Sequence, residues 1–321
     1  MIPYSWLEEA AERIAPHIRT TPLTYDPVQD LYLKWENHQI TGSFKLRGAL
    51  NKVLSLEEWE QKSGLLAASA GNHGQGVALA GKLVGAPVMI YVPQHAPAIK
   101  IEAMKALGAQ VFLVPGGYGE TEKAALQAAK KNEGIWISPY NDGHIIAGQG
   151  TLGLEILHQL ESIYDFQDRN AVWVVPASGG GLVSGIGAAI SNLSPRPRLV
   201  AVQSDTSPFL HSLFYRNTQE GIREFPTIAD GLSGPVQDGS ITIPIVRQFV
   251  DEIVLVSEEE IADSIALAWH QYGERLEGAA AVALAAVLTG KVNSRPAIVI
   301  LSGGNIQDEV FSRIIPKKAA P

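Results

Sequence analysis

Residues 171–189 read AVWVVPASGGGLVSGIGAA, and this stretch decides the fold class. It begins with an apolar run, Ala171 to Val175, that lacks polar alternation, which is typical of a strand buried on both faces of a parallel sheet. Pro176 ends the run, three glycines follow at 179–181, and a helical pattern begins at Leu182. When it repeats, this order of strand, turn and helix indicates an α/β fold.

The order repeats on both sides of this stretch. Apolar runs dominated by Val, Ile and Leu alternate with segments of helical periodicity, of which 121–131 and 258–272 are the clearest. Ser257 precedes three glutamates, which predicts an N-cap with acidic residues in the first helical turn. We therefore expect a parallel sheet covered by helices. The other predicted strands are residues 31–35, 65–68, 87–92, 110–114, 135–137, 199–203, 253–256 and 297–301.

The composition is that of a globular protein with a sizeable core. The 321 residues are 46% hydrophobic and 18% charged, and they suffice for one large domain or two ordinary ones. The net charge of −8 disfavours nucleic-acid and anionic-membrane partners, because phosphates would be repelled, and it favours solubility. The longest apolar stretch, residues 278–290, is too short to span a bilayer and predicts a buried helix. We expect a soluble, cytoplasmic protein with no membrane partner.

The glycine loop is a candidate phosphate site. Glycines allow backbone N–H groups to converge on an anion, and the following helix adds its dipole. The loop is not a dinucleotide fingerprint, because the third glycine should fall at Ser184 and is found at Gly185. It also lacks the Gly-Lys-Ser/Thr ending of a nucleoside-triphosphate loop. A tight turn with close packing is the alternative interpretation.

A lysine and two polar turns complete the candidate site. Lys45 lies in TGSFKLRGA (residues 41–49), where partial burial would lower the pKa of its amine and make it a nucleophile for Schiff-base formation. The alternative is a solvated lysine at a helix start. The turn SAGNH (residues 69–73) suits a carboxylate, although Asn72 and His73 could instead cap a helix that starts near Gly74. Ser302 could bond a ring nitrogen or merely end a strand.

Together these segments resemble the threonine/serine dehydratase (ammonia-lyase) family, within the fold-type II pyridoxal-phosphate enzymes. The Lys45 and Asn72 motifs are quite specific, and the glycine loop and the Ser302 turn are less so. The matches stand in the family's order and span nearly the whole chain. They are Thr21–Pro22–Leu23, residues 41–49 and 68–76, Gly148–Gln149–Gly150–Thr151 with Glu155, residues 179–182, Ala229–Asp230–Gly231, residues 277–284 and residues 302–305.

The resemblance implies a role for each site residue. Lys45 would be the Schiff-base lysine for pyridoxal 5'-phosphate and, once freed, the general base at the substrate Cα. Phe44 would pack near the cofactor ring, Asn72 would bond its phenolic oxygen, and Ser302 would bond its pyridine nitrogen. The phosphate would be bound by Ser178, Gly179, Gly180, Gly181 and Leu182. The substrate carboxylate would be held, largely through backbone N–H groups, by the loop of Ser69, Ala70, Asn72 and His73.

The resemblance also implies an architecture. We expect two open, twisted, mostly parallel sheets flanked by helices, similar to the tryptophan synthase β fold. The large cofactor-binding domain would combine residues 1–45 and 149–321, and residues 46–148 would form a small mobile domain. The chain would assemble as a homodimer or homotetramer.

The implied activity is that of a lyase, which removes water and then ammonia from a small L-hydroxy amino acid such as threonine or serine. Three alternatives remain. A cysteine-synthase-like β-replacement enzyme usually has threonine where this chain has His73. A serine racemase carries an acid–base serine where this chain has Ala70, whose methyl group cannot shuttle a proton. A non-catalytic protein that binds the cofactor is the third. The sequence does not rank threonine, serine or a larger hydroxy amino acid.

No metal site is predicted. The chain has no cysteine, which excludes disulfides, thiolate metal sites and a cysteine nucleophile. Some relatives bind a divalent cation through a glutamate just after the strand that corresponds to residues 199–202, where this chain has Gln203. A neutral amide is a weak ligand for a hard cation, so we expect none there, although Asp205 lies close by in the sequence.

Overall fold

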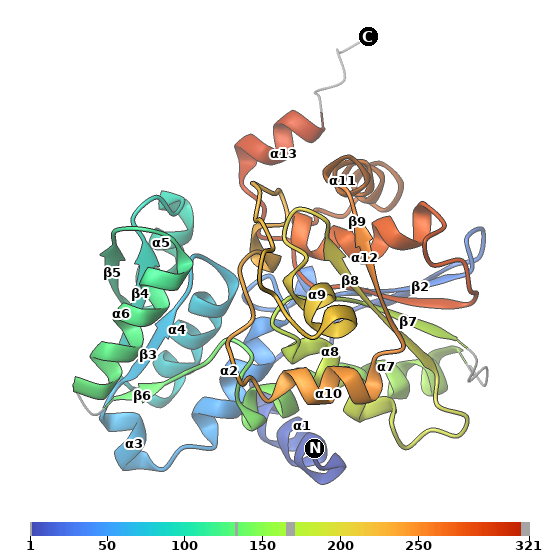
Figure 1. Cartoon of the computed structure of the whole chain (residues 1–321). Coiled ribbons are helices and arrows are strands. Elements are labelled where there is room, and N and C mark those ends of the chain that lie inside the picture. Colours follow the sequence, from blue (N-terminus) through green and yellow to red (C-terminus); the bar gives the residue numbers. More distant parts are fainter. Residues whose placement is uncertain (1, 132–133, 165–170, 316–321) are drawn as a thin grey trace.

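The computed structural model describes residues 2–131, 134–164 and 171–315. These residues form two sheets, and the smaller one lies at the left of Figure 1. The larger sheet has six strands in the order β1-β2-β10-β7-β8-β9, and the smaller has four in the order β5-β4-β3-β6. The strands are β1 (Leu23–Asp26), β2 (Leu31–Trp35), β3 (Leu65–Ala68), β4 (Val88–Pro93), β5 (Gln110–Val114), β6 (Ile135–Trp136), β7 (Val172–Pro176), β8 (Arg198–Ser204), β9 (Glu252–Val256) and β10 (Ala297–Leu301).

Helices flank both sheets. The predicted cap of α11 is present, because the Glu260 N–H donates to the Ser257 hydroxyl and the Ser257 N–H donates to the Glu260 carboxylate. The α-helices are α1 (Tyr4–Ile14), α2 (Lys45–Leu54), α3 (Glu58–Lys62), α4 (Asn72–Val84), α5 (Ala98–Ala106), α6 (Tyr118–Lys131), α7 (Gly143–Tyr164), α8 (Gly181–Ile190), α9 (Phe209–Arg216), α10 (Thr242–Phe249), α11 (Glu258–Tyr272), α12 (Gly278–Leu288) and α13 (Asp308–Ile314). The 3₁₀ turns are η1 (Ala15–His17), η2 (Glu36–His38) and η3 (Asp230–Leu232).

The six-stranded sheet is built from both halves of the chain. Strand β10 pairs in parallel with β2 on one side and with β7 on the other. Strands β7, β8 and β9 continue in parallel, and only the edge strand β1 runs antiparallel to its neighbour β2. The four-stranded sheet is parallel throughout. The predicted fold class, two mostly parallel sheets flanked by helices, is confirmed.

Both faces of the six-stranded sheet are covered, as its unbroken apolar strands predict. Successive residues of a strand point to opposite faces, so β10 contributes to two cores. Ile298 and Ile300 join one core with side chains of α7 and α8. Val299 and Leu301 join the other core with α12, whose residues from Gly278 to Val287 are all buried. The predicted buried helix at residues 278–290 is therefore confirmed.

The four-stranded sheet comes from a continuous segment that lies within residues 46–148. Leu65 and Ala67 of β3 and Ile90 of β4 form its core with apolar side chains of α2 and α4. Helix α6 packs along β3 and β4. The division at residues 46 and 148, and the mobility of the smaller part, remain predictions. In the part of the chain that the structure describes, no helix is both long and apolar enough to cross a membrane.

Candidate active site

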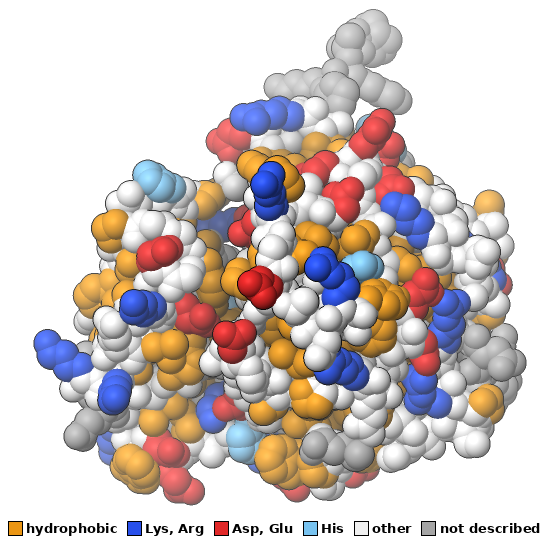
Figure 2. All heavy atoms as spheres, viewed as in Figure 1, with side chains coloured by type: hydrophobic (Ala, Val, Ile, Leu, Met, Phe, Trp, Pro, Cys, Tyr) orange, Lys and Arg blue, Asp and Glu red, His pale blue; other side chains and the backbone are white. Residues whose placement is uncertain are grey.

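A cavity of about 330 Å³ lies between the two sheets, within the range of small-ligand sites. Figure 2 shows this face of the molecule hollowed between the part built on the four-stranded sheet and the rest. All but one of the predicted site residues line the cavity. Those that do are Phe44, Lys45, Ala70, Asn72, His73, Ser178, Gly179, Gly180, Gly181, Leu182 and Ser302.

These residues converge because parallel strands end at the same edge of a sheet. The last residues of β3, β4 and β7 line the cavity themselves: Ala68, Pro93 and Pro176. The three predicted loops begin within two residues of the ends of β3, β7 and β10, where open α/β sheets bind their ligands. Two backbone hydrogen bonds join residues 41–49, which contain Lys45, to the loop after β10. The Phe44 N–H donates to the Ser302 carbonyl at 3.0 Å, and the Gly304 N–H donates to the Gly42 carbonyl at 2.9 Å.

Lys45 is the first residue of α2, and its amine faces the cavity. The Nζ atom donates a hydrogen bond to the carbonyl oxygen of Pro139, at 3.0 Å. Burial lowers the pKa of this amine to about 8, although the nearby Glu277 carboxylate opposes the shift. The neutral, nucleophilic amine is thus far more populated near neutral pH than it is in a lysine with the ordinary pKa of 10.5. Lys45 does begin a helix, as the alternative interpretation has it, but its amine faces the cavity and not the outer surface.

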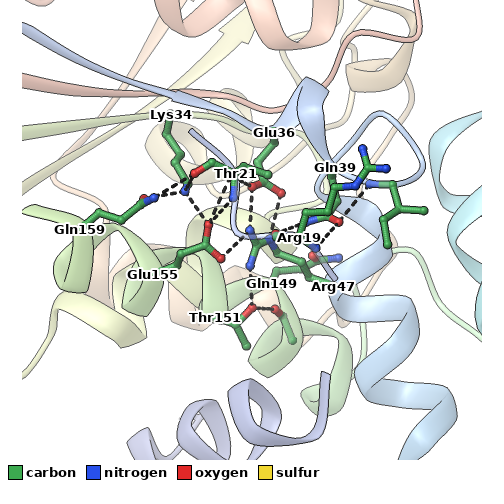
Figure 3. A network of polar contacts seen from close by, with 12 residues as sticks. Arg19, Thr21, Lys34, Glu36, Gln39, Arg47, Gln149, Thr151, Glu155 and Gln159 are labelled. Carbon is green, nitrogen blue, oxygen red and sulfur yellow. Dashed lines mark hydrogen bonds and ion pairs between the residues drawn. The ribbon is translucent and has the colours of Figure 1, made fainter. Parts of the chain in front are cut away.

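A buried ionic network holds the helix that carries Lys45 (Figure 3). The Arg47 guanidinium contacts Glu36 at 2.7 Å and Glu155 at 2.9 Å, and Lys34 contacts Glu155 at 2.6 Å. The side chains of Lys34 and Glu36 are fully buried and that of Arg47 almost so, and the two cations match the two carboxylates. Arg47 lies two residues after Lys45 in α2, so the network ties this helix to β2, η2 and α7 close to the site lysine.

The glycine loop makes room for an anion at the start of α8. Gly180 has φ of +84°, a conformation that side chains rarely adopt. A Cβ on Gly179 would lie 2.3 Å from the Tyr140 ring, and one on Gly181 would lie 2.9 Å from the Tyr140 Cβ. Glycine is thus required there so that the backbone can pass Tyr140. The first N–H groups of a helix have no partner within it, and they lie beside the cavity.

Asn72 lies in the first turn of α4, which begins two residues before the predicted start. Its amide nitrogen Nδ2 donates to Glu277 Oε1 at 2.6 Å. Its amide oxygen Oδ1 accepts from Asn305 Nδ2 at 2.7 Å, and the same nitrogen of Asn305 lies 2.8 Å from the carbonyl oxygen of Thr41. The N-cap of α4 is Gly71, so the alternative that Asn72 and His73 cap this helix is wrong.

Glu277 is a cavity residue to which the sequence assigns no role. It precedes α12, is 4% exposed, and lines the cavity with Asn72 and Lys45. Burial raises the pKa of its carboxyl to about 7, and Asp230 adds to this, while Lys100, Asn72 and Lys45 act in the opposite direction. An acidic residue directly before a wholly apolar helix was the available sequence signal.

The comparisons with known proteins agree with this geometry. A family model described as pyridoxal-phosphate dependent enzyme matches residues 11–303. This chain belongs to that family. It is 41% identical to the L-threonine ammonia-lyase of Thermotoga maritima, over 99% of this chain and 79% of the relative. The resemblance to threonine/serine dehydratases is therefore confirmed, and pyridoxal phosphate is the cofactor.

Two solved structures are similar over nearly the whole chain. The threonine deaminase of T.th. has a TM-score of 0.84 and 33% identity, over 95% of this chain and 99% of that one. Maize serine racemase has a TM-score of 0.87 and 30% identity, over 97% of this chain and 96% of that one. The fold is thus the same in proteins whose names denote deamination and racemisation.

The cavity residues of this pyridoxal-phosphate enzyme fit its cofactor. The glycine loop and the start of α8 offer backbone donors to a phosphate, and the Lys45 amine can reach an aldehyde within the same cavity. Ser302 follows β10, is 3% exposed, and lines the cavity with a hydroxyl group that can face a ring nitrogen. The cavity therefore offers a suitable group to the phosphate, to the aldehyde and to the ring nitrogen of pyridoxal phosphate.

His73 and Ser69 support the loop after β3 from within. The His73 Nε2 atom lies 2.9 Å from the carbonyl oxygen of Ile137, which can only accept, so Nε2 carries the proton. Burial and the nearby Lys45 lower the pKa of His73 to about 3, which keeps the ring neutral. Ser69 is the predicted site residue outside the cavity lining, and its hydroxyl accepts from the Gly71 N–H at 3.1 Å.

The described ranges contain no group of three or more His, Cys, Asp or Glu side chains that could hold a metal ion. Gln203, where some relatives have a glutamate ligand, is buried in the six-stranded sheet. Its side-chain oxygen accepts a hydrogen bond from the His211 N–H at 3.0 Å. Gln203 thus packs against α9, away from the cavity described above.

Proposed function

We propose that this enzyme removes water and ammonia from L-threonine or L-serine and releases a 2-oxo acid. The observation that carries the proposal is the Lys45 amine, which has a lowered pKa and faces a cavity bordered by the glycine loop and the turn at residues 69–73. The names of the Thermotoga relative and of the solved T.th. deaminase favour the same reaction, with threonine as the substrate.

Lys45 performs the proton chemistry in this proposal. Bound pyridoxal phosphate supplies the electron sink for the negative charge that develops at the substrate Cα. The Lys45 amine, when it is not bonded to the cofactor, removes the Cα proton at Nζ, a step that general-base catalysis accelerates by roughly 10²–10⁴-fold. The β-hydroxyl then takes up a proton and leaves as water, and the enamine that remains reacts with a second water to give a 2-oxo acid and ammonia.

The remaining site residues bind and orient. The backbone of Ser178, Gly179, Gly180, Gly181 and Leu182 would hold the phosphate, and Ser302 would face the pyridine nitrogen. Phe44 would pack near the ring, and Asn72 would donate to the phenolic oxygen. The loop of Ser69, Ala70, Asn72 and His73 would grip the substrate carboxylate; Ser69 would do so by shaping the loop, because its hydroxyl accepts from Gly71.

Racemisation is the second candidate, because maize serine racemase shares the fold at 30% identity. Ala70 lines the cavity in the loop that precedes Asn72. Its methyl group cannot carry a proton to the face of Cα opposite Lys45, so we expect elimination to dominate over formation of the D-amino acid. A gain in D-serine for Ala70→Ser would support this reasoning, and no gain would weaken it.

Two further properties belong to the proposal. We propose that the enzyme acts in the cytoplasm. We also propose that it assembles as a homodimer or homotetramer, as the family resemblance implies. Light scattering coupled to size-exclusion chromatography would measure the mass of the assembly against the 34.4 kDa of one chain. A mass of one chain would contradict the oligomer.

The deciding experiment measures 2-oxo acid release from a panel of L-hydroxy amino acids, with native chain and Lys45→Ala both supplied with pyridoxal phosphate. We expect turnover by the native chain and a loss of about 10²–10⁴-fold or more in the variant. The matched control is Lys52→Ala, which removes a lysine of the same helix that pairs with Asp142 outside the cavity lining. Equal turnover by native chain and Lys45→Ala would show that Lys45 is misassigned. No turnover by the native chain would favour β-replacement or a binding role.

A further inference from the structure

Glu277 has no place in the reaction as proposed, yet it is buried at the cavity among several site residues. Its Oε1 atom accepts the hydrogen bond from Asn72 at 2.6 Å. A Cβ on Gly303 would lie only 2.4 Å from the same oxygen, so a glycine next to Ser302 leaves the space that this carboxylate fills. The Glu277 N–H also donates to the Gly303 carbonyl at 3.2 Å. Backbone and side chain of Glu277 are thus both fixed.

The contacts of Asn72 determine which way its amide points. A carboxylate can only accept, so the group that faces Glu277 is the amide nitrogen. Asn305 donates to the amide oxygen, and Asn305 is itself held in contact with the carbonyl of Thr41. The oxygen of Asn72 is therefore occupied, and the second N–H of its nitrogen is the polar group left to face the cavity. Glu277 and Asn305 thus hold the same orientation of the amide from its two ends, and Glu277 is the partner that holds its nitrogen.

We propose that Glu277 is a positioning residue, which orients the Asn72 amide so that it donates a hydrogen bond to the phenolic oxygen of bound pyridoxal phosphate. The inference rests on the proposed place of Asn72 in the site. A donor at this oxygen stabilises its ionised form, and the protonation of this oxygen tunes the cofactor as an electron sink. Glu277 thus acts on the cofactor through Asn72.

Burial and the charges around Glu277 act on its carboxyl in opposite directions, and burial prevails, so the pKa is raised to about 7. Lys45 on α2 and Lys100 on α5 lower the pKa of the carboxyl, and Asp230 in η3 raises it. Lys100 and Asp230 form an ion pair at 2.8 Å, so their opposite effects on Glu277 arise from one fixed pair. The hydrogen bond from Asn72 requires that Oε1 carry no proton, and Lys100, Asn72 and Lys45 favour that state against burial and Asp230.

The test reads the two absorption bands of bound pyridoxal phosphate, whose ratio reports whether the phenolic oxygen carries a proton, and it needs no substrate. Glu277→Ala removes the acceptor, Glu277→Gln keeps an acceptor oxygen without the charge, and Asn72→Ala removes the donor. We expect Glu277→Ala and Asn72→Ala each to shift the ratio by roughly tenfold, the size of one hydrogen bond to a charged oxygen. We expect Glu277→Gln to stay close to the native ratio, and the double variant to shift no further than either single one.

The control is Glu258→Ala, which removes a half-buried carboxylate that accepts from Thr227 and Ile228 but does not line the cavity. A shift in Asn72→Ala without one in Glu277→Ala would overturn the inference and leave the proposed site intact. Equal shifts in Glu277→Gln and Glu277→Ala would also overturn it, because the charge alone would then matter. No shift in Asn72→Ala would contradict the proposed place of Asn72, and the inference would fall with it.

Discussion

Lys45 is subject to two opposing influences on its proton. Burial disfavours the ammonium form, whereas the negative charge of Glu277 favours it, and burial prevails. The amine donates to the carbonyl of Pro139, which fixes its position without adding charge. The pKa of about 8 lies well below the ordinary value of 10.5 for a lysine. The pH at which this amine becomes nucleophilic is therefore a property of the folded cavity.

We predict that cofactor loading reports this pKa. For chain freed of pyridoxal phosphate, the rate at which added cofactor bonds to Lys45 should rise about tenfold per pH unit below 8, because only the neutral amine attacks, and should level off above it. Stopped-flow absorbance would measure the rate, and Lys45→Ala is the control that should show no bonded cofactor. A rate that keeps rising beyond pH 10 would mean that Lys45 is solvated.

The site residues differ in how far they could be predicted from the sequence. Lys45 and Asn72 stand in contiguous motifs whose residue types suit their chemistry, and the structure brings both to one cavity. Glu277 begins one of the matching segments, at residues 277–284, but no role could be assigned to it from the sequence, because its partner Asn72 is 205 positions away in the chain. The orientation of an amide is a property of such long-range partners.

At the scale of elements, the buried ionic network of Arg47, Lys34, Glu36 and Glu155 stabilises the position of α2. Arg47 makes two contacts to Glu36, from Nε at 2.9 Å and from a terminal nitrogen at 2.7 Å, and one to Glu155. Thr21 adds a hydrogen bond from its hydroxyl to Glu36 at 2.6 Å. Because these charges are buried, each depends on its partners, and losing one of them leaves another unpaired.

We predict that Arg47→Leu destabilises the chain by ~3–5 kcal/mol, because Glu36 would stay buried without a cation. Urea denaturation followed by circular dichroism would measure the free energy of unfolding. The control is Lys62→Leu, which breaks an exposed ion pair with Glu58 in α3 and should change stability little. A loss in Arg47→Leu no larger than in the control would show that the network contributes specificity and not stability.

Most strands could be predicted because their apolar runs are unbroken, and the nine predicted runs agree with β2 to β10 within one residue at each end. Strand β1 was missed. It has only four residues, Leu23–Asp26, of which the two central ones are exposed. It is an antiparallel edge strand held by β2, so its conformation depends on its neighbour and not on an apolar pattern of its own.

At the scale of the whole molecule, an ion pair bridges the two sides of the cavity. Lys100 of α5 contacts Asp230 of η3 at 2.8 Å, and both line the cavity. The Lys100 side chain is 10% exposed and that of Asp230 is 50% exposed, so water reaches Asp230 much more than Lys100. If residues 46–148 form a mobile unit, as we propose, this pair is a contact that opening must break.

We predict that Asp230→Asn speeds deuterium uptake in α5, because the helix loses its charged contact to η3. Hydrogen exchange with mass spectrometry on chain loaded with cofactor would measure the uptake by segment. The control is Lys105→Gln, which breaks an exposed pair with Glu102 within α5 itself. Faster uptake throughout residues 46–148 would support the proposed mobile domain, whereas unchanged uptake in α5 would contradict the bridging role.

The central place of β10 has a consequence for protein synthesis. Strands β2 and β7 are both made before it, yet each of them pairs with β10 and neither can complete its side of the sheet until residues 297–301 have left the ribosome. The strands of the four-stranded sheet lie within residues 65–136 and the α2 side chains of its core precede them, so this sheet can form while translation continues. Ser302 and Asn305 follow β10 directly. A nascent chain therefore completes its cofactor pocket only after Ser302 has been made, about 120 residues after the glycine loop.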